Sequence, residues 1–450
     1  MKKQTWKLWT GVWMAALMLI AAGCSGGAAG GGAPAGSGNP APGSAADGNG
    51  GGKVKLEYWT RAQQEEIEQL KEIIFKDVLK EVDINFVTVP TGEYENKLRI
   101  AINGGKAPDI FEVDGVYTSN YAHNGALLEL DPYWDREDFE DYVNSSKEKT
   151  MYNGKRYAAS LHETSVVVFY NKDHFAKAGI MDVPSKFSEA WTWEQYLEAA
   201  KKLTQTEGGK TTVYGAIPGW KAPDNASEAA VFTHLLFIWN NGGQVTDEKL
   251  TTAKGYLDSD KTVQVLQFYQ DFFQKHKVAP MESITKSLEG FEVGKLSMFL
   301  GNISIANTLK KNYPDINFGV MPVPVGEKKY ATSGGWNIGI SSQTKHPKEA
   351  WKVIEALTGK EGHLKYAEFK GFIPSRKSAL EAMKSLNEFP LNVAKDSMPY
   401  AKARPITPAY AEISPIIGEM MNAIAYGNDV KTEATNAAAA IDKVLQKYAK

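Results

Sequence analysis

The amino-acid sequence predicts an α/β protein that begins with a parallel sheet. Two segments, Lys53 to Trp59 (KVKLEYW) and Val82 to Val89, alternate polar and apolar residues, as half-buried strands do. Residues 63–80 and 94–102 carry apolar side chains at helical spacing, and residues 109–113 form a short apolar run typical of a buried strand. The order strand, helix, strand, helix, strand produces a parallel sheet covered by helices.

The rest of the chain continues this mixture of strands and helices. Residues 156–170 contain two strand-like runs, of which the second, Val166 to Tyr170, is apolar enough to be buried. Further helices are predicted at residues 194–203, 227–239, 262–275, 348–357 and 361–369, further strands at 318–325 and 336–341, and a helix followed by a strand at 288–300. The remainder of the chain to Lys450 is mostly helical, and no internal repeat is found.

The N-terminus has the pattern of a cleaved secretion signal. Lys2, Lys3 and Lys7 give a positive start, and Leu8 to Ala22 form an apolar run that ends in small residues. A helix needs roughly 20 residues to span a bilayer, and this run is shorter. The sequence therefore predicts that residues 1–23 are a signal peptide.

The only cysteine of the 450 residues, Cys24, follows this run directly. Its position resembles the bacterial lipobox, which implies that Cys24 becomes the lipidated first residue of the mature chain. Ala21 departs from that pattern, since a leucine is more usual there. The alternative is an uncleaved anchor with an idle cysteine, and in both cases the rest of the chain lies outside the cytoplasmic membrane.

Residues 25–52 are almost entirely Gly, Ala, Ser, Pro and Asn. Such a segment cannot bury enough apolar surface to fold, so residues 24–52 are expected to be a lipidated cysteine followed by a flexible tether. The root-mean-square reach of a tether of this length is roughly 25–30 Å. Stable anchoring takes more than one acyl chain, which fits a diacylglycerol type of modification. A lipid anchor with a long tether suits the extracellular face of a Gram-positive membrane.

Composition bounds the partners of the chain. Residues 1–23 carry three lysines, so the mature chain has 48 Lys+Arg against 53 Asp+Glu and a formal charge of −5. The absence of a basic run argues against nucleic acid as a partner. The part after the tether, about 400 residues long, predicts roughly two domains. A single cysteine excludes an internal disulfide, so stability must come from a core rich in Trp, Tyr and Phe.

Most searches for catalytic motifs fail. The sequence has no Walker loop, no GxSxG motif and no metal-ligand spacing among its seven histidines. No catalytic residue, cofactor or metal ligand is therefore expected. Carboxylates are numerous, but no spacing among them points to a glycosidase pair.

Eight segments, taken in order, carry a more specific pattern. They are 96–133 (NKLRIAINGGKAPDIFEVDGVYTSNYAHNGALLELDPY), 154–180 with YNKDHFAKAGI, 192–204 (TWEQYLEAAKKLT), 239–243 (WNNGG), 291–300 (FEVGKLSMFL), 320–324 (VMPVP), 334–358 and 371–378 (GFIPSRKS). They resemble the extracellular solute-binding proteins of ABC importers, and most closely the family 1 branch of maltose-binding-protein-like carbohydrate receptors. The likeness covers almost all of residues 53–450.

The resemblance implies a two-lobed, periplasmic-binding-protein-like (type II) α/β fold with a hinge and a ligand cleft between the lobes. Crossovers are expected near residues 162–165, 328–331 and 371–374. Lobe 1 would comprise residues 53–162 and 331–371, and lobe 2 residues 163–330 and 372–450.

Candidate ligand contacts follow from the shape of sugars, which present apolar ring faces edged with hydroxyls and favour flat aromatics beside planar polar groups. Trp59 ends the first strand at its carboxyl end, where open α/β sheets bind ligands, and Arg61 and Gln63 follow it. Their alternative roles are core packing and solvated loop positions. Trp220 lies in a loop after Pro218-Gly219, and Trp336 follows Gly334-Gly335 close to a hinge.

The resemblance adds further candidates. It implies that Asp114 accepts a hydrogen bond from a sugar hydroxyl, and that Glu163 faces the ligand from the second lobe or, alternatively, forms a hinge hydrogen bond. Asn302, Arg404 and Tyr410 complete the set. Asp109 is expected to bind backbone donors, and Trp191, Trp193 and Trp239 are expected to pack in the core.

The sequence thus predicts a lipid-anchored, monomeric receptor that captures a carbohydrate, in particular an oligosaccharide, and delivers it to the membrane subunits of an ABC permease. One alternative is the same fold with a polyamine, a glycerol phosphoester or a peptide as its ligand. A more distant alternative is a secreted polysaccharide-degrading enzyme, for which Asp114 and Glu163 are the only pair that can be nominated.

Overall fold

The structure, a computed structural model, describes residues 52–219, 227–281 and 287–449. The predicted signal peptide, Cys24, all of the predicted tether but Gly52, and Trp220 lie outside these residues. Among the described residues, no helix is both long and apolar enough to cross a membrane.

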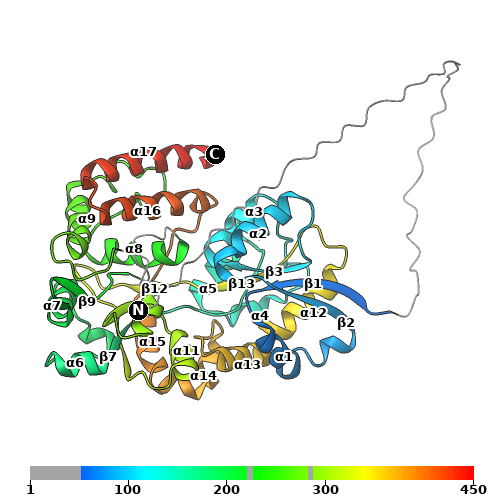
Figure 1. Cartoon of the computed structure of the whole chain (residues 1–450). Coiled ribbons are helices and arrows are strands. Elements are labelled where there is room, and N and C mark those ends of the chain that lie inside the picture. Colours follow the sequence, from blue (N-terminus) through cyan, green and yellow to red (C-terminus); the bar gives the residue numbers. More distant parts are fainter. Residues whose placement is uncertain (1–51, 220–226, 282–286, 450) are drawn as a thin grey trace, which may run out of the picture. The chain divides into compact units, whose positions relative to one another are not determined.

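The first group of elements is built on a five-stranded mixed sheet (Figure 1). Its strands, in spatial order, are β2 (Val82–Thr88), β1 (Val54–Thr60), β3 (Ile110–Asp114), β13 (Trp336–Ile340) and β6 (Ala159–Ser160). Strand β1 is parallel to β2 and β3, as the order of elements in the sequence predicts. Strand β13 comes from much later in the chain, yet it pairs antiparallel with both β3 and β6.

Helices cover both faces of this sheet. They are α1 (Gln64–Ile73), α2 (Thr91–Asn103), α3 (Thr118–His123), α4 (Arg136–Glu140), α5 (Asn144–Thr150), α12 (Pro347–Thr358) and α13 (Lys360–Lys370). One face packs Leu56 and Ile338 against α1 and α12, and the other packs Phe111 and Val113 against α2. The helix predicted over residues 63–80 ends at Ile73, because the chain turns there to bury Phe75 completely.

The second group of elements surrounds a three-stranded antiparallel sheet. Its strands, in spatial order, are β10 (Met298–Asn302), β7 (Val166–Asn171) and β11 (Phe318–Met321). Its helices are α6 (Lys172–Lys177), α7 (Trp193–Leu203), α8 (Glu228–Asn240), α9 (Asp260–Phe273), α10 (Ser287–Glu292), α11 (Ile305–Asn312), α14 (Lys377–Ala382), α15 (Leu391–Ser397), α16 (Tyr410–Ala425) and α17 (Val430–Tyr448).

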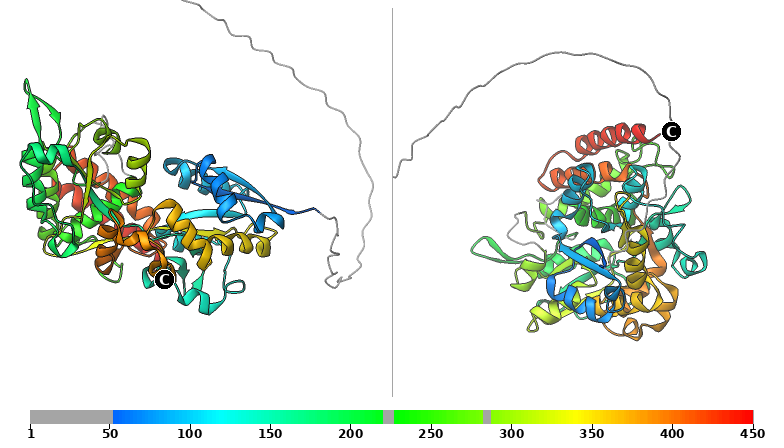
Figure 2. Two further views of the ribbon diagram at one scale, coloured as in Figure 1. Left: turned by 90° about the horizontal axis from the view of Figure 1, so that it is seen from below. Right: turned by 90° about the vertical axis from the view of Figure 1, so that its right-hand side faces the viewer.

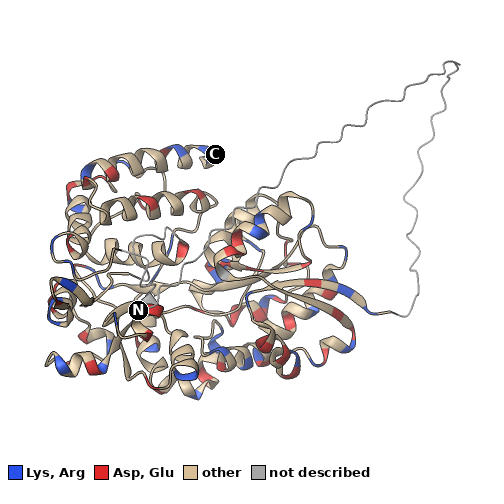
Figure 3. Cartoon of the chain, viewed as in Figure 1, with Lys and Arg blue, Asp and Glu red and all other residues tan. Residues whose placement is uncertain are grey.

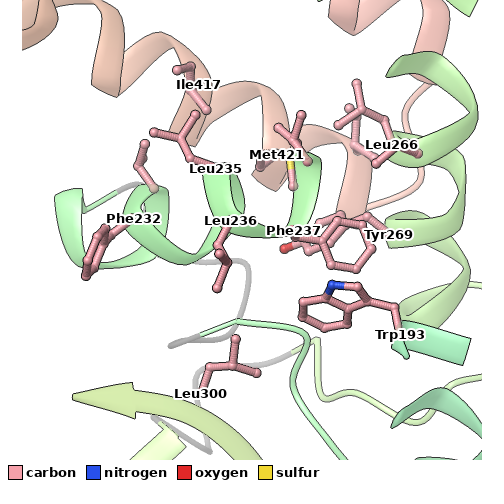
Figure 4. Packing of buried hydrophobic residues seen from close by; sticks show 14 of the residues in the cluster. Trp193, Phe232, Leu235, Leu236, Phe237, Leu266, Tyr269, Leu300, Ile417 and Met421 are labelled. Atoms are coloured by element: carbon pink, nitrogen blue, oxygen red, sulfur yellow. The ribbon is translucent and has the colours of Figure 1, made fainter. Parts of the chain in front are cut away.

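The core of this second group is aromatic. Trp193 is fully buried, and its ring meets that of Phe237 with centroids 4.5 Å apart. Tyr269 packs against Phe237 from α9, while Ile417 and Met421 close the cluster from α16 (Figure 4). Residues from four helices far apart in sequence therefore share one core.

Small strand pairs complete the fold. They are β4 (Met151–Tyr152) with β5 (Lys155–Arg156), β8 (Gln205–Glu207) with β9 (Lys210–Val213), and β12 (Ala331–Ser333) with β14 (Ala401–Ala403). The hairpin of β8 and β9 projects outward from the second group (Figure 2). Charged residues of both signs are interspersed over the surface helices of both groups (Figure 3).

Three segments connect the two groups and lie side by side. The N–H of Glu163 donates to the carbonyl of Ile373 (2.8 Å), and the N–H of Thr164 donates to the carbonyl of Gly334 (3.0 Å). The ring of His162 stacks on Phe372 with centroids 3.9 Å apart. Next to the crossover predicted near residues 328–331, residues 331–333 form β12, which pairs with β14.

Candidate ligand-binding site

The candidate site lies where the carboxyl ends of β1 and β3 meet the start of β13. Trp59 and Arg61 stand at the end of β1, and Asp114 is the last residue of β3. Trp336 opens β13 and lies directly opposite Asp114 in the strand register. Pairing of β1 with β3 and the antiparallel insertion of β13 thus bring four predicted site residues from three distant parts of the chain to one edge of the sheet.

Arg61 and Trp336 form a stacked pair at this edge. The guanidinium carbon of Arg61 lies 3.5 Å from the ring centroid of Trp336, within the range of a cation–π contact. The Nε–H of Arg61 donates to Oε2 of Glu112 at 2.7 Å. Tyr94 meets the indole edge-on, with centroids 5.6 Å apart.

Asp114 is tied to the second group of elements by an ion bridge. Nη2 of Arg404 donates to Oδ1 of Asp114 at 2.8 Å, and Nη1 of Arg404 donates to Glu228, the first residue of α8. The guanidinium also lies over Phe232 at 4.5 Å from its centroid. Asp114 and Glu228, which come from different groups, therefore share one buried arginine.

The groups around the ion bridge explain the protonation states of Arg404 and Glu228. Burial alone would lower the pKa of Arg404, but the carboxylates of Asp114 and Glu228 outweigh burial and raise it, so the arginine stays charged. Burial raises the pKa of Glu228, opposed by Arg404. The hydroxyls of Tyr410 (2.8 Å) and Ser414 donate to the same carboxylate, and Tyr117 donates to it at 3.3 Å.

Glu95 on α2 is a further carboxyl group near Asp114. Its Oε2 accepts a hydrogen bond from the hydroxyl of Tyr121 at 2.7 Å. Burial raises the pKa of Glu95 to about 7, and the charge of Asp114 adds to this shift. Glu95 therefore carries only part of a negative charge at neutral pH.

Glu163 lies within the hinge, where it is 5% exposed. Its Oε1 accepts from Nζ of Lys149 at 2.7 Å and from the hydroxyl of Ser146, and Lys149 also donates to the carbonyl of Gly334 at 2.6 Å. These contacts favour the structural alternative for Glu163, because the carboxylate is already occupied between two of the connecting segments.

The remaining predicted residues come from both groups of elements. Trp59 is half-buried and donates from Nε1 to Glu57 at 2.6 Å, while Gln63 is exposed and caps α1. Asn302 ends β10, where its Oδ1 accepts from the N–H of Ser304. Tyr410 is fully buried and reaches the site only through Glu228.

The residues assigned to packing behave as predicted. The N–H of Glu57 donates to Asp109 at 2.9 Å, and Thr344 donates to the same side chain. Trp193 is fully buried, and Trp191 and Trp239 pack against the same core.

Sequence reasoning missed Glu112, Glu228, Lys149 and Glu95. Glu112 carried a signal, since it is the one charged residue inside the buried run IFEV. A charge inside a buried strand must have a partner, so it points to an arginine or lysine nearby. The other three lie on helix surfaces by pattern and give no such signal. Within the described ranges, no group of three or more His, Cys, Asp or Glu side chains could hold a metal ion.

Two α/β groups joined by three adjacent segments, with a polar and aromatic site at the sheet edge, define a two-lobed binding protein. The sequence profile described as "Bacterial extracellular solute-binding protein" matches residues 61–363. The chain therefore belongs to the family of bacterial extracellular solute-binding proteins.

Individual relatives agree with this assignment. The arabinooligosaccharide-binding protein of Bacillus subtilis (strain 168) is 25% identical over 341 residues, which are 72% of this chain and 74% of the relative. The fold is similar to that of an ABC transporter solute-binding protein from Thermotoga lettingae bound with α-D-tagatose (TM-score 0.76, 24% identity, 87% of this chain and 100% of that one). It is equally similar to an ABC substrate-binding protein from Listeria monocytogenes in complex with cycloalternan (TM-score 0.76, 22% identity, 88% and 100%).

Proposed function

We propose that this protein is the substrate-binding lipoprotein of an ABC transporter and that it captures a carbohydrate, in particular an oligosaccharide, for delivery to a membrane permease. The observation that carries the proposal is the convergence of Arg61, Trp336 and Asp114 on one sheet edge. A guanidinium and an indole beside a carboxylate offer hydrogen bonds and apolar surface to a ring with apolar faces and hydroxyl edges. Sugar-binding relatives and structural neighbours support the same class of ligand.

The mechanism is closure of two lobes around the ligand, with residues 53–162 and 331–371 forming one lobe and 163–330 and 372–450 the other. Pairing of β12 with β14 moves the second boundary to about Gly334 in this proposal. A ligand drives closure only by binding the closed form more tightly than the open form. The Asp114–Arg404 contact joins the two proposed lobes. A sugar hydroxyl bound to Asp114 would therefore interact with a residue that is linked to both lobes. No bond is made or broken, and no cofactor takes part.

The balance of charge favours a neutral ligand over the charged alternatives. Glu112 is paired with Arg61, and Arg404 is shared by Asp114 and Glu228. A polyamine site would need several free carboxylates, and a phosphoester site several free cations. The polysaccharide-degrading alternative loses support as well, because Glu163 is bound to Lys149 inside the hinge and is not available as a proton donor or acceptor.

Attachment to the extracellular face of the membrane through Cys24 forms part of the proposal. In a bacterial host, the protein should be found in the membrane fraction and should be released only by detergent. Cys24→Ser should shift it to the soluble extracellular fraction or leave an uncleaved precursor. A wild-type protein found mainly in the cytoplasm would contradict this part of the proposal.

The ligand is tested by thermal shift and tryptophan fluorescence of the full-length protein. The panel would contain maltotriose, arabinotriose, diacetylchitobiose, spermidine and glycerol 3-phosphate. A ligand at about 100 Kd should add about 2.7 kcal/mol of stability. The response should be lost in Asp114→Ala and kept in Trp351→Phe, a change to a buried tryptophan on α12 of the same sheet group. A response to spermidine or glycerol 3-phosphate alone would overturn the carbohydrate assignment.

A further inference from the structure

Glu112 is a buried carboxylate that has entered the proposed function only through its ion pair with Arg61. Its side chain is 3% exposed and lies on β3, two residues before Asp114. Thr60 donates to its Oε1 at 2.6 Å and Tyr58 at 3.2 Å, while Arg61 donates to its Oε2 at 2.7 Å. A carboxylate with this many donors is held in one position, because each lost bond would leave a buried charge less satisfied.

The fixed carboxylate determines where the guanidinium of Arg61 lies. With Nε held by Glu112, the planar group rests 3.5 Å from the centroid of Trp336 and covers one face of the indole. A sugar ring cannot stack on that face. The surface offered to a ligand is therefore the guanidinium, which is backed by the indole.

One edge of this guanidinium remains free. Among the described residues, none accepts a hydrogen bond from Nη1 or Nη2 of Arg61, and its side chain is 17% exposed. Two N–H groups on the edge of a planar fork can donate in parallel to two neighbouring oxygen atoms. A pair of adjacent hydroxyls on a sugar ring supplies two such oxygens.

We propose that Glu112 is a positioning residue of the ligand site, which holds the guanidinium of Arg61 over the ring of Trp336 so that its free edge binds a pair of adjacent sugar hydroxyls. The inference rests on the proposed function, namely that the site takes a carbohydrate. According to this inference, the site selects its ligand through two hydroxyls that bind Arg61, and not through stacking of a sugar ring on an uncovered face of Trp336.

The test is a double-mutant cycle on the full-length protein with the panel sugar that binds most tightly. Arg61→Met removes the fork, and Glu112→Gln removes the charge that holds it. Each should weaken binding by about tenfold, the usual effect of losing hydrogen bonds to a charged group. The double variant should be no weaker than either single variant, because both changes remove the same interaction. Both single variants should also change the emission of Trp336, and this change should be absent in a Trp336→Phe background.

Asp138→Asn is the matched control. Asp138 holds Arg376 at 2.6 Å, and that guanidinium lies 4.4 Å over the ring of Tyr142, so the same kind of stack exists elsewhere in this sheet group. Asp138→Asn should lower the melting temperature and leave affinity within twofold of wild type. If wild type binds a sugar and both Arg61→Met and Glu112→Gln bind it with an affinity within twofold of wild type, this inference is overturned while the proposed function stands. If wild type binds no sugar, the proposed function fails and the inference fails with it. If Glu112→Gln does not fold, Arg61→Met and the Trp336 emission decide the result.

Discussion

Lys149 and Glu163 form a buried ion pair at the hinge, and removing the lysine should be strongly destabilising. The two side chains are 5% and 6% exposed, with Nζ and Oε1 2.7 Å apart. Lys149 reaches Glu163 between two glycines: a Cβ at Gly115 would lie 2.9 Å from Cδ of Lys149, and one at Gly335 would lie 3.0 Å from its Nζ. Lys149→Met would fill the same space and leave the carboxylate without its cation.

The size of the effect follows from what remains around Glu163. Breaking a buried pair by removing one partner costs about 3–5 kcal/mol, because an uncompensated charge is left behind. Ser145 and Ser146 still donate to Oε1 in the variant, so we expect the lower end, about 3 kcal/mol. The Gly334 carbonyl also loses its donor, which contributes to the same total. Lys149→Met/Glu163→Gln should recover part of the loss, because the buried charge is then gone as well.

Urea unfolding of wild type and variants measures these values from the shift in midpoint. Lys201→Met is the control, since Lys201 pairs with Glu198 at the same 2.7 Å but with side chains 35% and 64% exposed. The control should cost less than about 1 kcal/mol. A loss below about 1 kcal/mol for Lys149→Met, or a double variant less stable than the single one, would refute the reasoning.

Three further predictions concern pH, the core and the hinge glycines. The pKa of Glu95 is raised from 4.5 to about 7, so the folded state binds more protons than the unfolded state between these values, and its contribution of about 3 kcal/mol is present below pH 4.5 and lost as pH rises through 7. The urea midpoint of wild type should therefore fall as pH rises from 4 to 8, and that of Glu95→Gln should not show this fall. An equal change of midpoint with pH in both proteins would contradict the raised pKa of Glu95. Phe237→Ala should cost about 3–5 kcal/mol by thermal unfolding, since its ring is fully buried among Trp193 and Tyr269, whereas a loss near that of an exposed site would mean that the core can collapse around it. Gly335→Ala should prevent stable folding, as judged by soluble yield and circular dichroism, because φ is +139° and the new Cβ would lie 2.0 Å from the carbonyl oxygen of His162. Gly125→Ala, with φ +67° and open space around it, should cost only about 1 kcal/mol.

Local pattern was enough to predict the first sheet but not its completion. Alternation in β1 and β2 and the apolar run of β3 determine strands whose neighbours in sequence are also neighbours in space. The insertion of β13 beside β3 depends on burial of Ile338 and Ile340 under α12, a contact between distant segments that periodicity does not record. The end of α1 was missed for a similar reason, since helical spacing continues past Ile73 while Phe75 is drawn into the core.

The candidate site likewise contains residues that local sequence pattern predicts and residues that it does not. Asp114 and Trp336 could be predicted as candidates because a strand end and a Gly-Gly pair mark them in the sequence. Glu112, which binds Arg61, and Glu228, which shares Arg404 with Asp114, became visible only when strands and helices were placed side by side. Glu163 had two interpretations in the sequence, and its burial, which no local pattern encodes, favours the hinge hydrogen bond.

The late position of β13 also determines the order in which the molecule can fold. Until residues 336–340 have been synthesised, β3 is an edge strand with free N–H and C=O groups facing outward, and such edges invite pairing with other chains. The side chains that cover the other strands, Trp351 and Ile354, come later still. A nascent chain therefore carries its N-terminal sheet with an unpaired edge through most of translation, and that edge is exposed to pairing with other chains until β13 is in place.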